Sequence, residues 1–306
     1  MRKLSTLLLL AVSLVTRAAP PVDAPPLPLA ELKAGSKGQV WTVFRGTEPE
    51  AFDVIVTGVL QNALGPGKSL IVCELTDPRV QSMGAVAGMS GSPLYIEGRM
   101  AGALSYQIQR FETVRHAGFT PVADLDEVKA RLAPGLASTT GSPRVGPLDP
   151  AYEPLQPVFS LGGLSPAVAD LFAPHFRTLG LSVTALGGSL QSATGGAAAT
   201  AGPRPVPGGA VAVALTTGDI TLAGTGTVSS VQGERVTAFG HPLLGLGEVE
   251  LPMCSAEILT ILPSQMQSMK ISNTGTVIGT ISQDRLSAVS GVLGAGPRMI
   301  DVTIRV

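Results

Sequence analysis

The sequence predicts a mainly β protein, and three observations support that fold class. The chain has 306 residues, of which 37 are glycine and 25 are proline, so turns must be frequent. Runs of β-branched and aliphatic residues recur at strand-like lengths between these breaks. Strands at this spacing favour a barrel or a sandwich, in one large domain or two modest ones.

The chain begins with the pattern of a secretory signal peptide over residues 1–19. A basic start, Met1 to Lys3, precedes the apolar run Leu4 to Val15 and a small-residue end at Ala18-Ala19. We therefore expect export, to the periplasm or outside a bacterial cell. The alternative is a signal anchor, but the run is shorter than the roughly 20 residues that a spanning helix needs. After signal removal, no stable membrane insertion is expected.

A first β-rich half is expected over residues 28–135. Its predicted strands are residues 39–45, 52–60, 69–75, 94–97 and 100–107, separated by turns rich in glycine and proline. A short helix is predicted from Leu125 to Leu132, because Asp124 can cap its start and Pro134 ends it.

Two linkers and a small segment are expected between the halves, over residues 136–209. Residues 136–155 and 189–209 are rich in Gly, Pro, Ser, Thr and Ala, which is typical of linkers or loops. Residues 156–188 lie between them, with a predicted helix from Ser165 to Phe172. This segment is too short for a core of its own, so it should dock on a larger unit.

A second β-rich half is expected over residues 210–306. Its clearest predicted strands are residues 211–215, 226–228, 235–239 and 302–306.

The most informative stretch is Gly88-Met89-Ser90-Gly91-Ser92-Pro93. A Gly-x-Ser-Gly turn places the Ser90 hydroxyl at the tip of a tight bend, as a nucleophile requires. The amides of Gly88 and Ser90 could form an oxyanion hole, in which one donor typically contributes about 3 kcal/mol. The alternative is an ordinary Gly/Ser-rich β-turn.

Two further residues are candidates for a triad with Ser90. His241 lies between glycine and proline at the end of an apolar strand, and its ordinary pKa near 6.5 suits a general base. Asp77, in Thr76-Asp77-Pro78-Arg79, could orient the imidazole. Alternatively, His241 is a structural loop residue, and Asp77 opens a turn by bonding Arg79 or its own backbone.

Composition argues against several other classes of function. The net charge is −1 and no basic patch is dense enough for nucleic acid. His116, His175 and His241 lack metal-ligand spacing, so neither a metal nor a cofactor is expected. Cys73 and Cys254 could form one disulfide between the halves or remain buried free thiols.

The three candidate residues together resemble the SpoIVB (stage IV sporulation protein B) serine peptidase family. The resemblance lies in the Asp-Pro-Arg string, in Gly-Met-Ser-Gly-Ser-Pro and in Ala238-Phe239-Gly240-His241. It extends over most of residues 33–130 and 208–295, and it implies a catalytic triad of Asp77, Ser90 and His241.

A more distant resemblance to trypsin-like enzymes implies two packed β-barrels with the active site between them. In the sporulation peptidase the histidine precedes the other two residues. Here the order is Asp77, Ser90, His241, so we expect the two β-rich halves in permuted order. Because Asp77 lies closer to the serine than the trypsin-like acid does, it could line the substrate pocket instead.

These features predict an exported serine endopeptidase that cleaves peptide bonds through an acyl-enzyme. Its partners would be protein or peptide substrates, including its own linker near residues 189–209. The alternative function is a catalytically inactive, peptidase-like binding or scaffold protein of the cell envelope.

Overall fold

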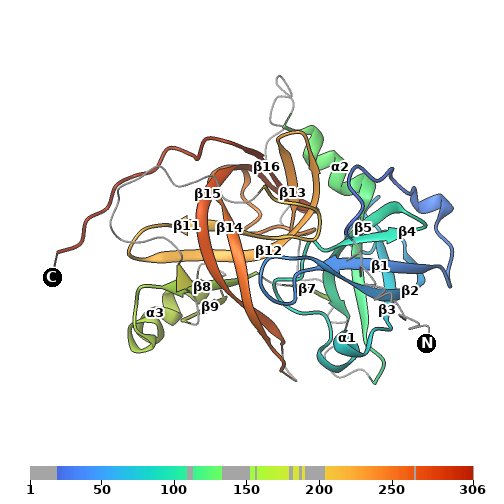
Figure 1. The fold of residues 1–306 in the computed structure, drawn as a ribbon, viewed down its shortest axis with the longest axis horizontal. Coiled ribbons are helices and arrows are strands. Elements are labelled where there is room, and N and C mark those ends of the chain that lie inside the picture. Colours follow the sequence, from blue (N-terminus) through green and yellow to red (C-terminus); the bar gives the residue numbers. More distant parts are fainter. Residues whose placement is uncertain are drawn as a thin grey trace, which may run out of the picture.

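The chain folds into two β-barrels that pack side by side (Figure 1). The structure is a computed structural model, and it describes residues 19–108, 113–132, 152–155, 157–178, 182–185, 188–189, 204–264 and 267–305. Strands make up 49% of the described residues and helices 13%, with two closed six-strand barrels, so the predicted double-barrel, trypsin-like fold class is confirmed. The signal peptide predicted over residues 1–19 lies almost entirely outside the described residues.

Barrel one is built from the first six strands of the chain. They close in the order β1-β2-β3-β6-β5-β4, since β4 pairs with both β5 and β1. All five strands predicted in this half are present, and β6 was not predicted. Their bounds are β1 Lys37–Thr42, β2 Glu50–Leu60, β3 Leu70–Leu75, β4 Pro93–Ile96, β5 Arg99–Ile108 and β6 His116–Pro121.

Barrel two repeats this strand order with the last six strands. The ring runs β11-β12-β13-β16-β15-β14, so its strands also close in the order first, second, third, sixth, fifth, fourth. Each barrel therefore presents equivalent loops at equivalent places. The bounds are β11 Ala210–Thr216, β12 Thr221–Gln232, β13 Arg235–Ala238, β14 Gly247–Leu262, β15 Met269–Arg285 and β16 Ala288–Leu293.

The helices differ from the sequence-based expectations at their starts and ends. The predicted helix after β6 is α2 (Val122–Ala130), and it begins three residues early, with Pro121 at its N-cap. Asp124 is not the cap, because its carboxylate binds Lys68 at 2.7 Å. The later helix, α3 (Pro166–Thr178), runs beyond the predicted end at Phe172 and contains Pro174. Helix α1 (Pro78–Met83) and the 3₁₀ turn Leu29–Glu31 were not predicted.

Parts of the two expected linkers form ordered strands. Residues 152–154 form β7, which pairs with β5, and Gly188–Ser189 form β10, which pairs with β15. Between them, β8 (Val158–Gly162) pairs with β12 and with β9 (Ser182–Thr184). Phe159, Leu161 and Ala169 lie in the buried cluster of barrel two, so the described residues of segment 156–188 pack on that barrel.

Each barrel has its own apolar core. Cys73 lies in the core of barrel one and Cys254 in a cluster of barrel two, and both are buried free thiols. The structure therefore holds no disulfide between these two residues.

The end of the chain contradicts one predicted strand. Within the described part, residues 302–305 form no strand, and the chain leads away from barrel two to its end (Figure 1). The apolar side chains of Ile300, Val302 and Ile304 are exposed. Strand β16 already pairs with β13 on one side and with β15 on the other, so neither of its edges is free to pair with this segment.

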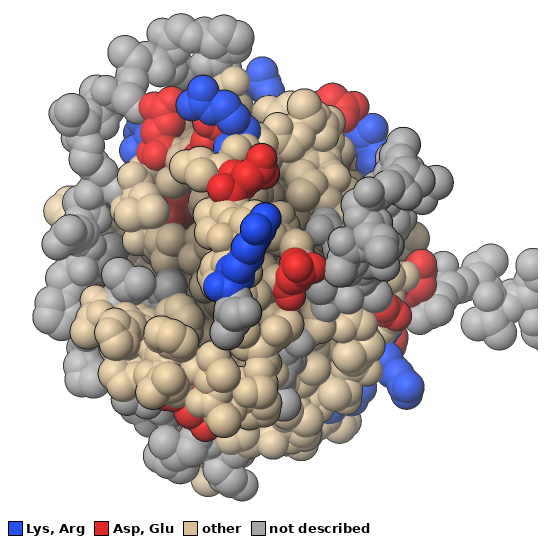
Figure 2. All heavy atoms as spheres, turned by 90° about the vertical axis from the view of Figure 1, so that its left-hand side faces the viewer, with Lys and Arg blue, Asp and Glu red and all other residues tan. Residues whose placement is uncertain are grey.

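The surface carries few charged side chains. Figure 2 views the molecule from the side of barrel two, where Lys and Arg lie interspersed with Asp and Glu on a largely uncharged face. Among the described residues, no helix combines the length and the apolar character needed to span a bilayer.

Candidate active site

Ser90 lies in the loop that leads from the third to the fourth strand of barrel one, after α1. Two glycines with positive φ, Gly88 at 95° and Gly91 at 95°, produce its tight bend. The Gly91 amide donates to the carbonyl of Leu104 in β5 at 2.7 Å, and the Met89 amide donates to that of Val86 at 2.9 Å. The loop is therefore held by its own turn and by strand β5.

Barrel two packs directly on this loop. A Cβ at Gly91 would lie 2.0 Å from the Thr227 carbonyl oxygen and 2.4 Å from the Phe239 nitrogen. The Thr227 hydroxyl donates to the Gly88 carbonyl at 2.9 Å, and that of Ser229 donates to the Gly91 carbonyl at 2.8 Å. Only glycine fits at position 91, because the two barrels meet there without room for a side chain.

His241 lies in the equivalent loop of barrel two, between its third and fourth strands. After β13 ends, Phe239 and Gly240 both adopt positive φ, at 70° and 68°, and turn the chain inward. Positive φ at a buried phenylalanine is a strained conformation that only a well-packed environment maintains. The Thr120 hydroxyl of barrel one supports this turn by donating to the Gly240 carbonyl at 2.6 Å.

One residue of β12 connects the two candidate loops. The Thr227 amide donates to the Ser90 carbonyl at 2.8 Å, and the Thr227 carbonyl accepts from the Phe239 amide at 3.2 Å. The fold therefore brings the loops of Ser90 and His241 to the same place between the barrels, although the residues are far apart in sequence.

Ser90 Oγ and His241 Nε2 are buried and unpartnered within the described part of the chain. Neither Ser90 nor His241 has measurable solvent exposure, and Ser90 Oγ and His241 Nε2 have no hydrogen-bond partner among the described residues. Buried polar atoms are usually satisfied, so two such atoms in adjacent loops are exceptional in this structure.

Burial also determines the protonation of His241. Its Nδ1 lies 2.7 Å from the Pro242 carbonyl oxygen, which favours a proton on Nδ1 and leaves Nε2 free to accept one. Desolvation lowers the pKa of His241 to about 4, against the opposing effect of hydrogen bonds to the backbones of Pro242 and Leu155. The imidazole of His241 is therefore neutral at pH 7 in the structure.

Asp77 caps helix α1 in the structure. Its carboxylate accepts from the Arg79 amide at 2.9 Å and pairs with the Arg79 guanidinium at 2.9 Å. These bonds lower the pKa of Asp77. Such contacts fit the alternative interpretation of the Asp-Pro-Arg string, while the orienting role of Asp77 stays a prediction.

A second carboxylate, which the sequence analysis missed, supports the histidine loop. Asp284 lies at the end of β15 without solvent exposure and accepts from the amides of Leu243 and Leu244, each at 2.8 Å, and of Leu246 at 3.3 Å. Burial raises its pKa, although these bonds oppose the shift. Its partners are backbone amides distant in sequence, so no local pattern marks this residue.

A buried lysine packs against the predicted oxyanion loop and was also missed. A Cβ at Gly88 would lie 3.1 Å from the Lys270 side chain, and the Lys270 Nζ donates to the Thr42 hydroxyl at 2.8 Å. Desolvation lowers the pKa of Lys270 to about 7. Lys270 thus forms one wall of the turn whose Gly88 and Ser90 amides are the predicted oxyanion donors.

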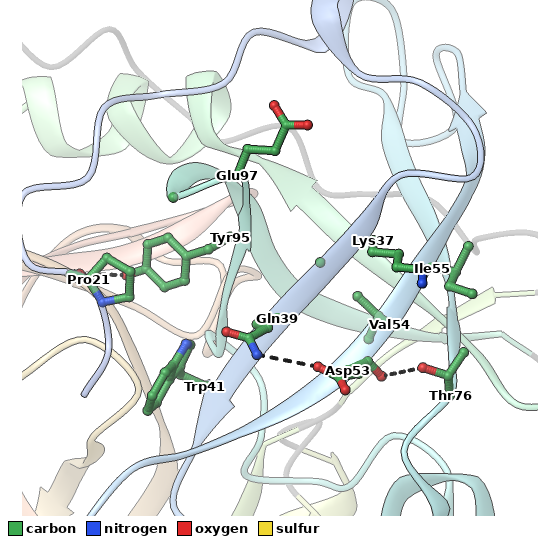
Figure 3. A pocket seen from close by; sticks show the side chains of 12 residues that line it. Pro21, Lys37, Gln39, Trp41, Asp53, Val54, Ile55, Thr76, Tyr95 and Glu97 are labelled. Carbon is green, nitrogen blue, oxygen red and sulfur yellow. Dashed lines mark hydrogen bonds between the residues drawn. The ribbon is translucent and has the colours of Figure 1, made fainter. Parts of the chain in front are cut away.

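A separate pocket of about 550 Å³ opens on the outer surface of barrel one (Figure 3). Its lining includes Trp41, Asp53, Tyr95 and Thr76, the neighbour of Asp77, but none of the three predicted triad residues. In Figure 3 the Thr76 hydroxyl bonds to the Asp53 carbonyl at 3.0 Å. Among the described residues, no group of His, Cys, Asp and Glu could hold a metal ion.

Comparison with known families agrees with the resemblance noted in the sequence. Residues 24–112 match the family described as SpoIVB peptidase S55. Over these residues the chain is similar to that family. The matched segment includes Asp77 and Ser90 but ends before β6, so His241 lies outside it. At the level of the family, the match indicates a serine peptidase. Searches of curated proteins and of solved structures found no match.

Proposed function

We propose that this protein is an exported serine endopeptidase in which Ser90 is the nucleophile and His241 the general base. The observation that carries the proposal is the convergence of two equivalent loops on Thr227, one from each barrel. Ser90 Oγ and His241 Nε2 have no hydrogen-bond partner among the described residues, not even each other, so the proposal requires the bond between nucleophile and base to form when a substrate enters.

In the proposed reaction, the Ser90 oxygen forms a bond to the substrate carbonyl carbon while its proton passes to His241 Nε2. The amides of Gly88 and Ser90 stabilise the oxyanion. The C–N bond then breaks as His241 returns the proton to the leaving amine, which yields an acyl-enzyme. A water molecule repeats the sequence, releases the carboxylic acid product and restores Ser90.

The proposal keeps Asp77 as the acid that orients His241, on the strength of the motif. In the structure Arg79 holds this carboxylate and Pro242 holds the His241 Nδ1, so the contact would form only after both groups leave these partners. Comparing Asp77→Asn with Asp284→Asn tests this assignment. Loss of hydrolysis in the folded Asp77→Asn variant supports it, whereas loss in Asp284→Asn alone transfers the role to Asp284.

Hydrolysis of a broad peptide library tests the proposed function. We expect Ser90→Ala and His241→Ala each to abolish cleavage while the circular dichroism of the folded chain is retained. If both variants cleave at the rate of the unchanged chain, Ser90 and His241 are not the catalytic pair. If the unchanged chain binds peptides without cleaving them and Ser90→Ala binds equally well, the protein is a binding scaffold instead.

A further inference from the structure

The segment that enters the candidate site from the same chain is β7 with the residue that follows it. Strand β7 (Tyr152–Pro154) lies antiparallel to the end of β5, with Pro154 opposite Tyr106 and Tyr152 opposite Ile108. An extended peptide that adds to a strand in this way is held by main-chain hydrogen bonds, which is a common mode of peptide recognition. In Figure 1, β7 lies where the two barrels meet.

The hydrogen bonds of β5 place Leu155 beside the Ser90 loop. The Leu155 amide donates to the Ser105 carbonyl at 2.8 Å, and the preceding carbonyl of β5, that of Leu104, accepts from Gly91 at 2.7 Å. The pairing of β5 with β6 shifts register between Leu104 and Tyr106, so Ser105 occupies a bulge. Bulges redirect backbone groups, and this one allows adjacent carbonyls of β5 to hold both segments.

The backbone of Leu155 also reaches His241. The proximity of the Leu155 backbone raises the pKa of His241, which places Leu155 beside the proposed general base. The amide of Leu155 is thus held by β5 while its backbone contacts His241. A substrate residue that precedes the cleaved bond would need both contacts, because its carbonyl must face the nucleophile and the base.

The Leu155 side chain fills an apolar site formed by the serine barrel. Its exposed fraction is 1%, and it belongs to the same buried cluster as Met89 and Leu104. Met89 precedes Ser90, and Leu104 precedes Ser105. The Leu155 side chain therefore shares its apolar cluster with direct sequence neighbours of Ser90 and of Ser105.

We propose that residues 152–155 are a built-in pseudo-substrate. They add to β5 as an extra strand and block the Ser90 and His241 pair, and the burial of Leu155 indicates that the site accepts a leucine-sized aliphatic side chain before the cleaved bond. This inference rests on the proposed peptidase function. Because the segment competes with external peptides for the site, the unchanged chain should cleave them, but more slowly than a chain from which the segment has been displaced.

Labelling of Ser90 by a fluorophosphonate in the full chain tests the block. Leu155→Asp places a charge in the apolar site, so the segment should leave and labelling should accelerate by about tenfold or more, as expected when the competent state becomes dominant. The matched control is Leu171→Asp on α3, where the leucine is 70% exposed and the labelling rate should not change.

Inhibition of the Leu155→Asp variant tests the specificity. A peptide aldehyde of sequence Tyr-Glu-Pro-Leu should slow labelling at a concentration at least about tenfold lower than the same peptide ending in Asp, since only leucine fits the apolar site.

The outcomes separate this inference from the function on which it rests. If Ser90 is labelled at equal rates in the unchanged chain and Leu155→Asp, or if the two aldehydes inhibit equally, the pseudo-substrate is wrong and the peptidase stands. If Ser90 is labelled in no folded variant, the proposed function itself fails. If the Leu155→Asp variant does not fold, the same labelling experiment is made with Leu155→Ala. If Leu155→Ala lowers the thermal stability without accelerating the labelling of Ser90, Leu155 is only a core residue and the pseudo-substrate is wrong.

Discussion

At the scale of single residues, the main feature is the complete burial of the two candidate reacting side chains. His241 and Ser90 have no solvent exposure, and the atoms that would exchange a proton have no hydrogen-bond partner among the described residues. Sequence motifs predicted both residues, because glycines and a proline mark the turns that hold them. The positioning roles of Asp284 and Lys270 could not be predicted, since their contacts come from distant strands.

The lowered pKa of His241 predicts a specific dependence of stability on pH. Above pH 6.5 neither the folded nor the unfolded imidazole is charged. Between pH 6.5 and about 4 only the unfolded state binds the proton. Lowering the pH through this range therefore lowers the free energy of unfolding, and His241 accounts for up to about 3 kcal/mol of this loss. Urea unfolding of the unchanged chain and of His241→Gln, which cannot titrate, measures the difference. Parallel pH curves would show that His241 is not buried in this way.

At the scale of elements, local sequence predicted strands better than it predicted their partners. Strands β1 to β5 follow from β-branched runs bounded by turn residues. The long hairpin of β14 and β15 was missed, because polar residues and Pro252 interrupt its apolar pattern. Residues 152–155 read as linker from their composition, yet they pair with β5, a contact that no local pattern encodes.

The contact between the Ser90 loop and barrel two predicts an intolerance at Gly91. Gly91→Ala combines an unfavourable positive φ with a clash against the backbone of Thr227 and Phe239. We expect it to lower the free energy of unfolding by more than about 3 kcal/mol. Gly35→Ala is the matched control, because Gly35 also has positive φ but open space around it. This substitution should lower the free energy of unfolding by only about 1–2 kcal/mol. Equal losses in both variants would mean that the barrels do not meet at Gly91.

At the scale of the whole molecule, one strand order is used twice. Both barrels close in the same order, and each contributes one candidate reacting group from the loop between its third and fourth strands. The sequence suggested two β-rich halves but could not reveal this repeat, because the order follows from strand pairing. In the structure the serine barrel comes first, while the permutation relative to the sporulation peptidase stays a prediction.

The cores of the two barrels predict the behaviour of the thiols. Cys73 and Cys254 are buried in separate clusters, and burial raises the pKa of both thiols. We expect neither to react with a thiol reagent in the native protein and both to react in denaturant without a reductant. Finding no free thiol after denaturation would reveal a disulfide and a different relation between the barrels.

The pairing of Ser90 with His241 across the two barrels is the central claim, and site-specific labelling tests it most directly. The Leu155→Asp chain would be treated with a fluorophosphonate and the adduct located by mass spectrometry, beside the same chain carrying Ser90→Ala or His241→Ala. The account predicts an adduct on Ser90 that disappears in both double variants. A folded protein without an adduct, or an adduct on Ser90 that persists without His241, would contradict it.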